Sequence, residues 1–311
     1  MSFYVYTYGW RPDETELCRM EMRAFFTEDT EENVLISDVK VEPSRSPFIR
    51  ARLAVQFEAT TVDELCERIK TIQLGEKTYR VVSLNDVALS GTEKWGHTKR
   101  RAVERQLALA IEGEPNLTSP HIVFGVVQLG EAYYFGELVE GEAVWLNHQD
   151  RPQQYSTALS TKVARALVNI AVPEIAGKRV IDPCCGVGTV LVEALSMGID
   201  IVGRDMNWFV TSGSRKNIAH FGYNGEVRLG PIEDITEQYD VAIIDMPYNV
   251  FTHSDEGSLQ SIVTSARRIA ERVLFVTVEP MDDMLKVARF TVVDRAIVRK
   301  GNFSREVLLC K

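Results

Sequence analysis

A carboxylate followed by a glycine-rich turn stands in VIDPCCGVGT (residues 180–189). The apolar run ends at Asp182, and Gly186 and Gly188 follow before a helix-like segment begins. Glycine lets the backbone approach a ligand, and the first N–H groups of a helix lack intrahelical partners. Because an acidic residue at a strand end repels phosphate and attracts a cation, we expect a positively charged sulfonium or amino group here. The spacing matches neither the G-x-G-x-x-G of a dinucleotide site nor a P-loop.

Asp205 ends the next strand-like run, nineteen residues after Gly186. A carboxylate at this point can accept hydrogen bonds from both hydroxyls of a ribose. The competing role for Asp205 is that of a helix N-cap, for which Asn207 is an equally suitable residue. With Asp182 and the glycines in register, the ribose role is favoured.

The segment GPIEDI (230–235) follows the third strand-like run. Ile232 can pack on the face of an adenine, and Glu233 or Asp234 can accept a hydrogen bond from the adenine amine. The competing interpretation is a polar loop, and this segment adds weight only beside the two preceding ones.

The string IIDMPYN (243–249) contains what methyl transfer to a ring-bound amine requires. Asp245 ends a strand-like run and can accept a hydrogen bond that aligns the amine lone pair. The Met246 carbonyl, held by Pro247, can accept a second bond, and Tyr248 offers a flat face for stacking. The competing interpretation is a strand-to-loop turn with a chance aromatic residue.

The adjacent pair Cys184 and Cys185 does not suit a metal or redox site. Neighbouring cysteines cannot easily chelate one metal ion, and no C-x-x-C motif is present, so we expect both to line the pocket by packing, with a redox role as the weaker alternative. The five cysteines also lack framework spacing, which indicates reduced thiols in a cytoplasmic protein.

Strands and helices alternate strictly from residue 178 onward, which predicts a parallel sheet covered on both faces. The runs at 290–300 and 304–311 predict a closing antiparallel hairpin. Before them, residues 1–150 are typical of a smaller α+β region, and the pattern breaks near residue 150. There is no run of 18 apolar residues and no basic start with an apolar core, so neither a membrane span nor a secretory signal is expected.

The net charge of −9 argues against an abundant nucleic-acid binder. Local charge matters more to a phosphate than the average, and basic clusters occur at 44–52 and 93–106. Within the second cluster, the amphipathic segment 99–110 predicts a basic helix. An RNA-binding face and an ordinary solvated face are equally compatible with it.

Together, DPCCGVGTVLVEA, GRD and DMPY resemble the motifs of class I S-adenosylmethionine methyltransferases that methylate amines, which read D-P-F-C-G-S-G-T and [DN]-P-P-Y. The segment YSTALSTKVARALVNIA (155–171) resembles the P-x-x-M-x-P-K-L-A-R-x-M-V-N element of the THUMP-containing tRNA guanine N2-methyltransferases. SRKNIAHFG and SREVLLC also match patterns of that family. Met246 stands where the family has the first proline of its second motif.

The resemblance implies a Rossmann-like class I fold at 151–311, with a seven-stranded, mostly parallel sheet and an antiparallel C-terminal hairpin. It implies a ferredoxin-like α+β region at 1–60 and a THUMP-like RNA-binding region at 61–150. The implied activity is S-adenosylmethionine-dependent methylation of an exocyclic amine in structured RNA, with guanine N2 in tRNA as the leading target. The alternatives are a cofactor-binding RNA-binding protein without turnover, and an amino-methyltransferase of DNA adenine or protein glutamine.

The site residues expected on this basis fall into three groups, with no metal ligand among them. The catalytic group is Asp245, Pro247 and Tyr248. The cofactor-binding group is Asp182, Cys184, Gly186, Gly188, Asp205, Met206, Ile232 and Glu233. The RNA-binding group is Lys99, Arg100, Arg101 and Arg105.

Overall fold

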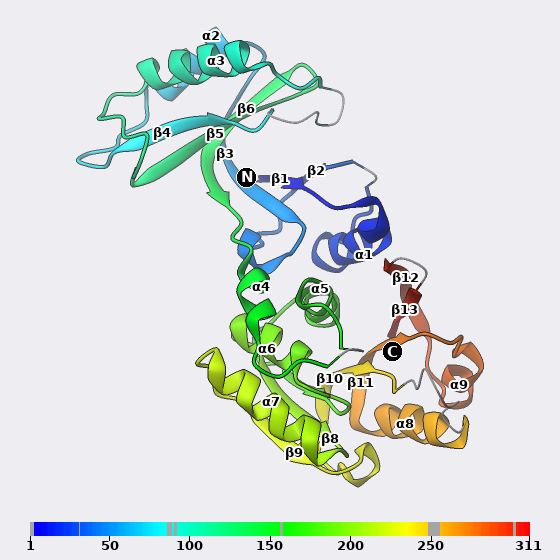
Figure 1. The fold of residues 1–311 in the computed structure, drawn as a ribbon. Helices are drawn as coiled ribbons and strands as arrows, with labels where there is room; N and C mark the ends of the chain where they lie inside the picture. The colour runs from blue at the N-terminus through cyan, green and yellow to red at the C-terminus, as the bar shows by residue number, and fades with distance from the viewer. Residues whose placement is uncertain are drawn as a thin grey trace. The chain divides into compact units, whose positions relative to one another are not determined.

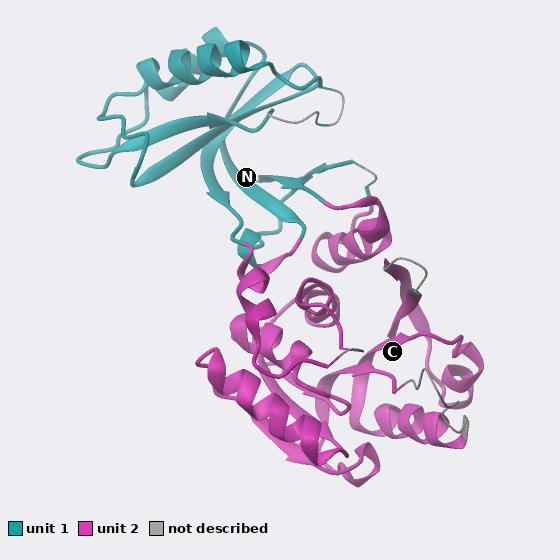
Figure 2. Ribbon diagram, viewed as in Figure 1, with its two compact units in different colours: residues 1–9, 30–44, 48–142 teal, residues 10–29, 45–47, 143–311 magenta. Residues whose placement is uncertain are grey.

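The computed structural model describes residues 3–30, 32–85, 89, 92–155, 158–247, 256–300 and 303–311. The chain forms two compact units (Figure 2). Unit 1 comprises residues 1–9, 30–44 and 48–142, and unit 2 comprises residues 10–29, 45–47 and 143–311. An N-terminal helix therefore belongs to the same unit as the C-terminal half of the chain.

Unit 1 is built on one six-stranded sheet in the order β2-β1-β3-β6-β5-β4 (Figure 1). Its strands are β1 (Tyr4–Tyr8), β2 (Val34–Ser37), β3 (Ile49–Ala59), β4 (Tyr79–Ser83), β5 (Ile122–Leu129) and β6 (Ala132–Glu140). Helices α2 (Val62–Ile69) and α3 (His97–Ala110) pack on it through Leu65 and Leu107, against Phe124 and Phe135. A single sheet thus includes strands from both sides of residue 60, and the division into ferredoxin-like and THUMP-like parts stays a prediction.

Unit 2 contains a seven-stranded sheet in the order β12-β13-β11-β10-β7-β8-β9. Its strands are β7 (Arg179–Asp182), β8 (Asp200–Asp205), β9 (Glu226–Leu229), β10 (Tyr239–Asp245), β11 (Ala270–Thr277), β12 (Val292–Lys300) and β13 (Phe303–Cys310). Strands β7 to β11 pair in parallel, whereas β13 pairs antiparallel with both β11 and β12. The expected Rossmann-like fold with its C-terminal hairpin is confirmed.

Helices cover both faces of this sheet (Figure 1). They are α4 (Val144–Asn147), α5 (Thr161–Ala171), α6 (Thr189–Ser196), α7 (Trp208–His220), α8 (Glu256–Ile269) and α9 (Asp282–Val287), together with α1 (Thr15–Phe26) from the N-terminal segment. Strand β10 is apolar on both sides: Ala242 and Ile244 pack in the core with α8, and Val241 and Ile243 are also buried. This double burial explains why the strand is a continuous apolar run. Among the described residues, no helix combines the length and apolarity that crossing a bilayer requires.

Helix α1 is fixed to α5 by a buried polar network. The Asn169 side chain donates to Glu21 at 2.7 Å, and the Ser46 hydroxyl donates to the other Glu21 oxygen. The Arg45 guanidinium in turn donates to Asn169 at 3.1 Å. Burial raises the pKa of Glu21 to about 7, against the opposing effect of these hydrogen bonds. Buried polar groups need partners, so this network specifies how the N-terminal helix docks within unit 2.

A second buried network ties α6 to α5 and to the segment that enters unit 2. Glu193 on α6 is fully buried and accepts a hydrogen bond from Arg165 on α5 at 2.8 Å. Nδ1 of His148 lies 2.8 Å from the other Glu193 oxygen, and its Nε2 lies 3.1 Å from the Tyr223 hydroxyl. Because α6 begins at the glycine-rich turn, this network also supports that turn from behind.

Replacing Glu193 by alanine would leave Arg165 and His148 buried without their acidic partner. We expect Glu193→Ala to lower the free energy of unfolding by about 3–5 kcal/mol, since an uncompensated buried charge is costly. Urea denaturation followed by circular dichroism measures this change. The exposed Glu174 provides the control, because Glu174→Ala should change the free energy by less than about 0.5 kcal/mol. Equal losses for the two variants would contradict the supporting role of the network.

Candidate active site

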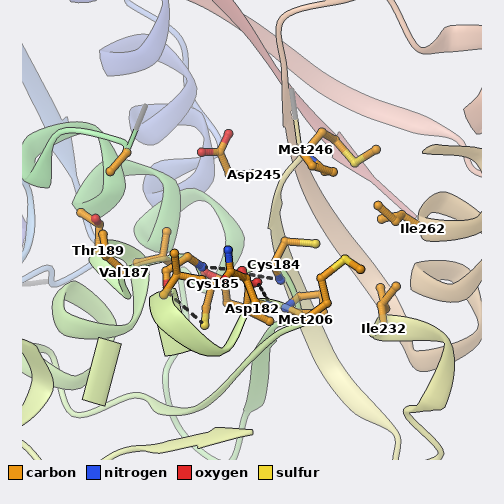
Figure 3. A pocket seen from close by; sticks show the side chains of 18 of the residues that line it. Asp182, Cys184, Cys185, Val187, Thr189, Met206, Ile232, Asp245, Met246 and Ile262 are labelled. Carbon is orange, nitrogen blue, oxygen red and sulfur yellow. Dashed lines mark hydrogen bonds between the residues drawn. The ribbon is translucent and has the colours of Figure 1, made fainter. Parts of the chain in front are cut away.

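The strand order of unit 2 determines where its ligand site lies. The chain runs outward from β7 to β8 and β9 on one side, and from β10 to β11 on the other. Ligands of such sheets bind outside the carboxyl ends of the strands where the order reverses, which here is between β7 and β10. A cavity of about 390 Å³ lies at this point (Figure 3). Its volume is within the usual range for a cofactor or drug-sized ligand.

The glycine-rich turn forms one wall of this cavity. Gly186 and Gly188 have φ angles of +51° and +80°, in the left-handed region that favours glycine. A Cβ atom on Gly188 would also lie 2.2 Å from the Ser214 hydroxyl oxygen, so the close packing of α7 needs glycine there. The Gly186 N–H donates to the Asp205 carboxylate at 3.0 Å, which joins the turn to the end of β8.

Asp182 lies at the base of the cavity and is only 3% exposed. It accepts a hydrogen bond from the Cys184 N–H at 3.2 Å. Burial raises the pKa of Asp182 well above its usual range, and the nearby carboxylates of Asp245 and Asp205 raise it further. A cationic ligand would offset these effects and lower the pKa of Asp182, because a nearby positive charge favours the ionised carboxyl.

Asp205 is not the N-cap of the helix that follows it. Its carboxylate accepts hydrogen bonds from the N–H groups of Gly186 and Asn207 at 3.0 and 2.9 Å. Asn207 fills the capping position of α7, since its side-chain oxygen accepts from the Phe209 N–H at 2.9 Å. Asp205 lines the cavity, and its carboxylate oxygens have acceptor capacity beyond these two bonds, so the capping alternative no longer competes with ligand binding.

The segment after β9 closes the cavity on the side of β8. Ile232 is almost fully buried and lines the cavity, whereas Met206 lines it from an exposed turn. Glu233 also lines it and accepts a hydrogen bond from the Ser261 hydroxyl on α8 at 2.6 Å. An apolar side chain next to an oriented acceptor can accommodate an adenine ring, and the assignment of Ile232 and Glu233 to this role stays a prediction.

Asp245 at the end of β10 holds an unpaired acceptor. Its Oδ1 atom is buried and has no hydrogen-bond partner within the described part of the chain. Burial raises the pKa of Asp245 to about 6. Figure 3 shows its carboxylate apart from the group formed by Asp182, Cys184 and Cys185. A buried acceptor without a partner costs free energy, so this atom is ready for a donor from a substrate.

Of the predicted catalytic group, the structure describes Pro247 but not Tyr248. Met246 and Pro247 line the cavity, and the Met246 N–H donates to the Val276 carbonyl on β11 at 2.8 Å. Tyr248 lies outside the described residues, so its stacking role stays a prediction.

The two cysteines are packed as neutral thiols. Both line the cavity, and burial raises the pKa of each well above its usual range. A Cβ atom on Gly203 of β8 would lie 3.2 Å from the Cys185 sulfur, so this thiol fills space above the sheet. All five cysteines of the chain are free.

The predicted RNA-binding residues lie on α3 in unit 1. Lys99, Arg101 and Arg105 are exposed, and the Lys99 ammonium stands 4.4 Å from the centre of the Trp95 ring. Arg101 makes an exposed ion pair of 3.3 Å with Glu104 on the same helix, and Arg100 is half-buried. Their assignment to RNA binding stays a prediction.

Sequence reasoning missed several residues that shape the cavity. Tyr155, with 54% of its surface exposed, lines the cavity at its mouth; it begins the segment 155–171 that resembles a family element, but that resemblance gave it no role. Arg204 donates to the Pro231 carbonyl at 2.9 Å and fixes the segment that carries Ile232. Asn217 on α7 is fully buried, although its residue type is usual at a surface.

The charges of the residues that line the cavity fit S-adenosylmethionine. Four lining residues are acidic, namely Asp182, Asp205, Glu233 and Asp245. The lining residues that the structure describes include no lysine, arginine or histidine. This surface suits a ligand with a sulfonium and an ammonium group and disfavours a phosphate-bearing dinucleotide.

Comparisons with known proteins agree with this geometry. Residues 148–304, about half of the chain, match the family described as "RMKL-like, methyltransferase domain". The chain is 38% identical over 103 residues to the tRNA (guanine(10)-N2)-dimethyltransferase of Methanothermobacter thermautotrophicus, covering 32% of this chain and 30% of that protein. It is 28% identical over 173 residues to the protein of the same name from Methanocaldococcus jannaschii, covering 50% and 48%. The chain thus spans less than half the length of these two relatives.

A solved structure of TrmN from Thermus thermophilus has the same fold, with a TM-score of 0.50 and 16% identity over 100% of this chain and 99% of that one. The family match confirms the methyltransferase class that the sequence motifs indicated. The chain therefore belongs to the RMKL-like methyltransferase domain family, with a Rossmann-like fold in its C-terminal unit.

Proposed function

We propose that the protein methylates the exocyclic amine of a guanine in tRNA. The observation that carries this proposal is the buried, unpaired Oδ1 atom of Asp245, which lies at the same cavity as Asp182 and Asp205. An exocyclic amine is a donor that such an acceptor can bind. The two relatives named as tRNA guanine N2-dimethyltransferases support guanine as the base that carries it.

The cofactor would be held by the acidic surface of the cavity. When bound, S-adenosylmethionine supplies an electrophilic methyl group on a sulfonium. Asp182, beside the glycine-rich turn, would bind its amino end, and Asp205 would accept bonds from its ribose hydroxyls. The adenine would pack against Ile232 and Met206, with Glu233 as the acceptor for its amine.

Asp245 would act on the substrate amine by alignment and proton acceptance. A guanine amine is hardly basic, so its lone pair must be directed at the methyl group by a fixed acceptor. After attack, the same carboxylate can take the proton released from nitrogen. Met246 directly follows β10, and its N–H is fixed by the bond to the Val276 carbonyl; its own carbonyl would accept the second N–H. Tyr248 would stack on the base.

Unit 1 would supply RNA affinity through α3. Val103 and Leu107 bury one face of this helix in the core, which leaves Lys99, Arg101 and Arg105 exposed. Phosphates respond to such a local basic face even when the whole chain carries a net charge of −9. We therefore propose structured RNA as the partner of unit 1.

Replacing Asp245 tests the proposed chemistry directly. We expect Asp245→Ala to lower kcat for methyl transfer to unmodified tRNA by about 10²–10⁴-fold, because alignment and proton acceptance are both lost. Binding of S-adenosylmethionine should stay within about threefold of wild type. Tritiated-methyl transfer and calorimetric titration measure the two quantities, and the exposed Asp283 provides the control variant Asp283→Ala.

Each other outcome has a distinct meaning. Transfer that persists in Asp245→Ala would exclude Asp245 as the acceptor for the amine. Cofactor binding with transfer to DNA or protein but not tRNA would exclude the proposed substrate. Binding without transfer to any of them would favour a non-catalytic RNA-binding protein.

The pKa of Asp245 predicts the acid limb of the pH profile. Its pKa is raised to about 6, and only the ionised carboxylate can accept both the hydrogen bond and the proton. The wild-type kcat/KM for tRNA should therefore be level above about pH 7 and fall about tenfold per unit below pH 6, because kcat/KM follows the pKa of the free enzyme. Single-turnover methyl transfer between pH 5 and 8 measures this, and a rate that rises on acidification would exclude a carboxylate base.

Charge reversal on α3 tests the role of unit 1. We expect the double variant Lys99→Glu/Arg105→Glu to raise KM for tRNA and to reduce the slope of log affinity against log salt by about 2, since each phosphate contact contributes about one unit. Filter binding at several salt concentrations measures the slope. The control is Lys40→Glu/Lys77→Glu, which makes the same charge change at exposed positions of unit 1 outside α3. Equal slopes for both double variants would contradict RNA binding by α3.

A further inference from the structure

Asn217 makes three hydrogen bonds from a fully buried position on α7. Its side-chain oxygen accepts from the Gln153 N–H at 2.9 Å. Its amide nitrogen donates to the Gln153 carbonyl at 3.0 Å and to the Val187 carbonyl at 2.8 Å. One amide therefore binds two backbone segments that lie far apart in the sequence and far from Asn217 itself.

The same face of α7 contacts these segments a second time. Gly213 precedes Asn217 by one helical turn and so lies on the same side of the helix. A Cβ atom on Gly213 would lie 3.4 Å from Gln153 Cβ and 3.8 Å from Val187 Cγ1. Helix α7 thus contacts both segments twice: the Gly213 backbone packs against the side chains of Gln153 and Val187, and the Asn217 side-chain amide hydrogen-bonds to their backbone.

Each segment borders a different part of the cavity. Val187 belongs to the glycine-rich turn between Gly186 and Gly188 and lines the cavity. Gln153 precedes Tyr155 by two residues, and the half-exposed Tyr155 ring lines the cavity mouth. An exposed aromatic ring at the mouth of a base-modifying site offers a stacking surface that any base can use.

We propose that Asn217 is a positioning residue that holds the rim at Gln153–Tyr155 in register with the glycine-rich turn, and that Tyr155 contacts the RNA substrate. The second half rests on the proposed function, whereas the first half concerns the protein and its cofactor alone. The amide is needed because one side chain must supply two donors and one acceptor at fixed positions. Aspartate has the same shape but no donor, and its charge would face two carbonyl oxygens.

The decisive test is a double-mutant cycle between Asn217 and Tyr155. We expect Tyr155→Ala to raise KM for tRNA about tenfold and to leave the Kd of S-adenosylhomocysteine unchanged. We expect Asn217→Asp to raise both quantities by about tenfold, since it releases both segments. In the double variant, KM for tRNA should be no higher than in Asn217→Asp alone, because the rim is already displaced. The exposed neighbour Lys216 provides the control variant Lys216→Gln.

Hydrogen–deuterium exchange gives a readout that needs no methyl transfer. Asn217→Asp should speed exchange in peptides covering 151–155 and 184–188, and leave 62–69 of unit 1 unchanged. In the wild-type protein, S-adenosylhomocysteine should slow exchange in the peptides covering 151–155 and 184–188. In Asn217→Asp, it should slow exchange only in the peptide covering 184–188. Asn217→Ser breaks the same bonds without adding charge, and replaces Asn217→Asp if thermal unfolding shows that the latter does not fold.

The outcomes separate the two proposals. Unchanged exchange at 151–155 in a folded variant, or additive effects in the double-mutant cycle, would overturn the positioning role of Asn217. A KM for tRNA unchanged in Tyr155→Ala would overturn substrate contact by Tyr155. If no RNA is methylated but exchange responds as expected, the proposed function fails while the positioning role stands.

Discussion

The central constraint on unit 2 is the gathering of carboxylates at one partly apolar cavity. The parallel pairing of β7, β8 and β10 brings Asp182, Asp205 and Asp245 to the same edge of the sheet, because each residue ends its strand. Burial opposes ionisation and raises the pKa values of Asp182 and Asp245, and repulsion from the carboxylates of Asp245 and Asp205 raises the pKa of Asp182 further. Such an arrangement costs folding free energy, and a cationic ligand with an amine-bearing substrate gives it a chemical use.

The supporting elements follow from the need to hold this edge still. Helix α6 leaves the glycine-rich turn and is anchored by the bonds of Glu193 to Arg165 and His148. Helix α5 carries that anchor on one side and Asn169, the partner of Glu21, on the other. Because buried charges are tolerated only when they are paired, these networks specify one arrangement of the helices rather than simply adding stability.

Charge is distributed differently in the two units, and the average over the chain conceals it. The cavity of unit 2 is lined by acidic residues, whereas α3 of unit 1 presents Lys99, Arg101 and Arg105 to solvent. A cationic cofactor and an anionic nucleic acid make opposite demands, so separate surfaces of opposite sign suit them. The net charge of −9 therefore says little about what either surface could bind.

The sequence by itself determined the parallel sheet, the glycine-rich turn and the positions of Asp182, Asp205 and Asp245, because residues at strand ends follow from local alternation and turn chemistry. Only the tertiary structure decided the contacts between distant segments. Asn217 meets Gln153 across 64 residues, and Glu21 meets Asn169 across 148. It also decided that α1 belongs to unit 2 and that Tyr155 borders the cavity. A buried asparagine has the same local signature as an exposed one, and the difference arises only when the helices pack.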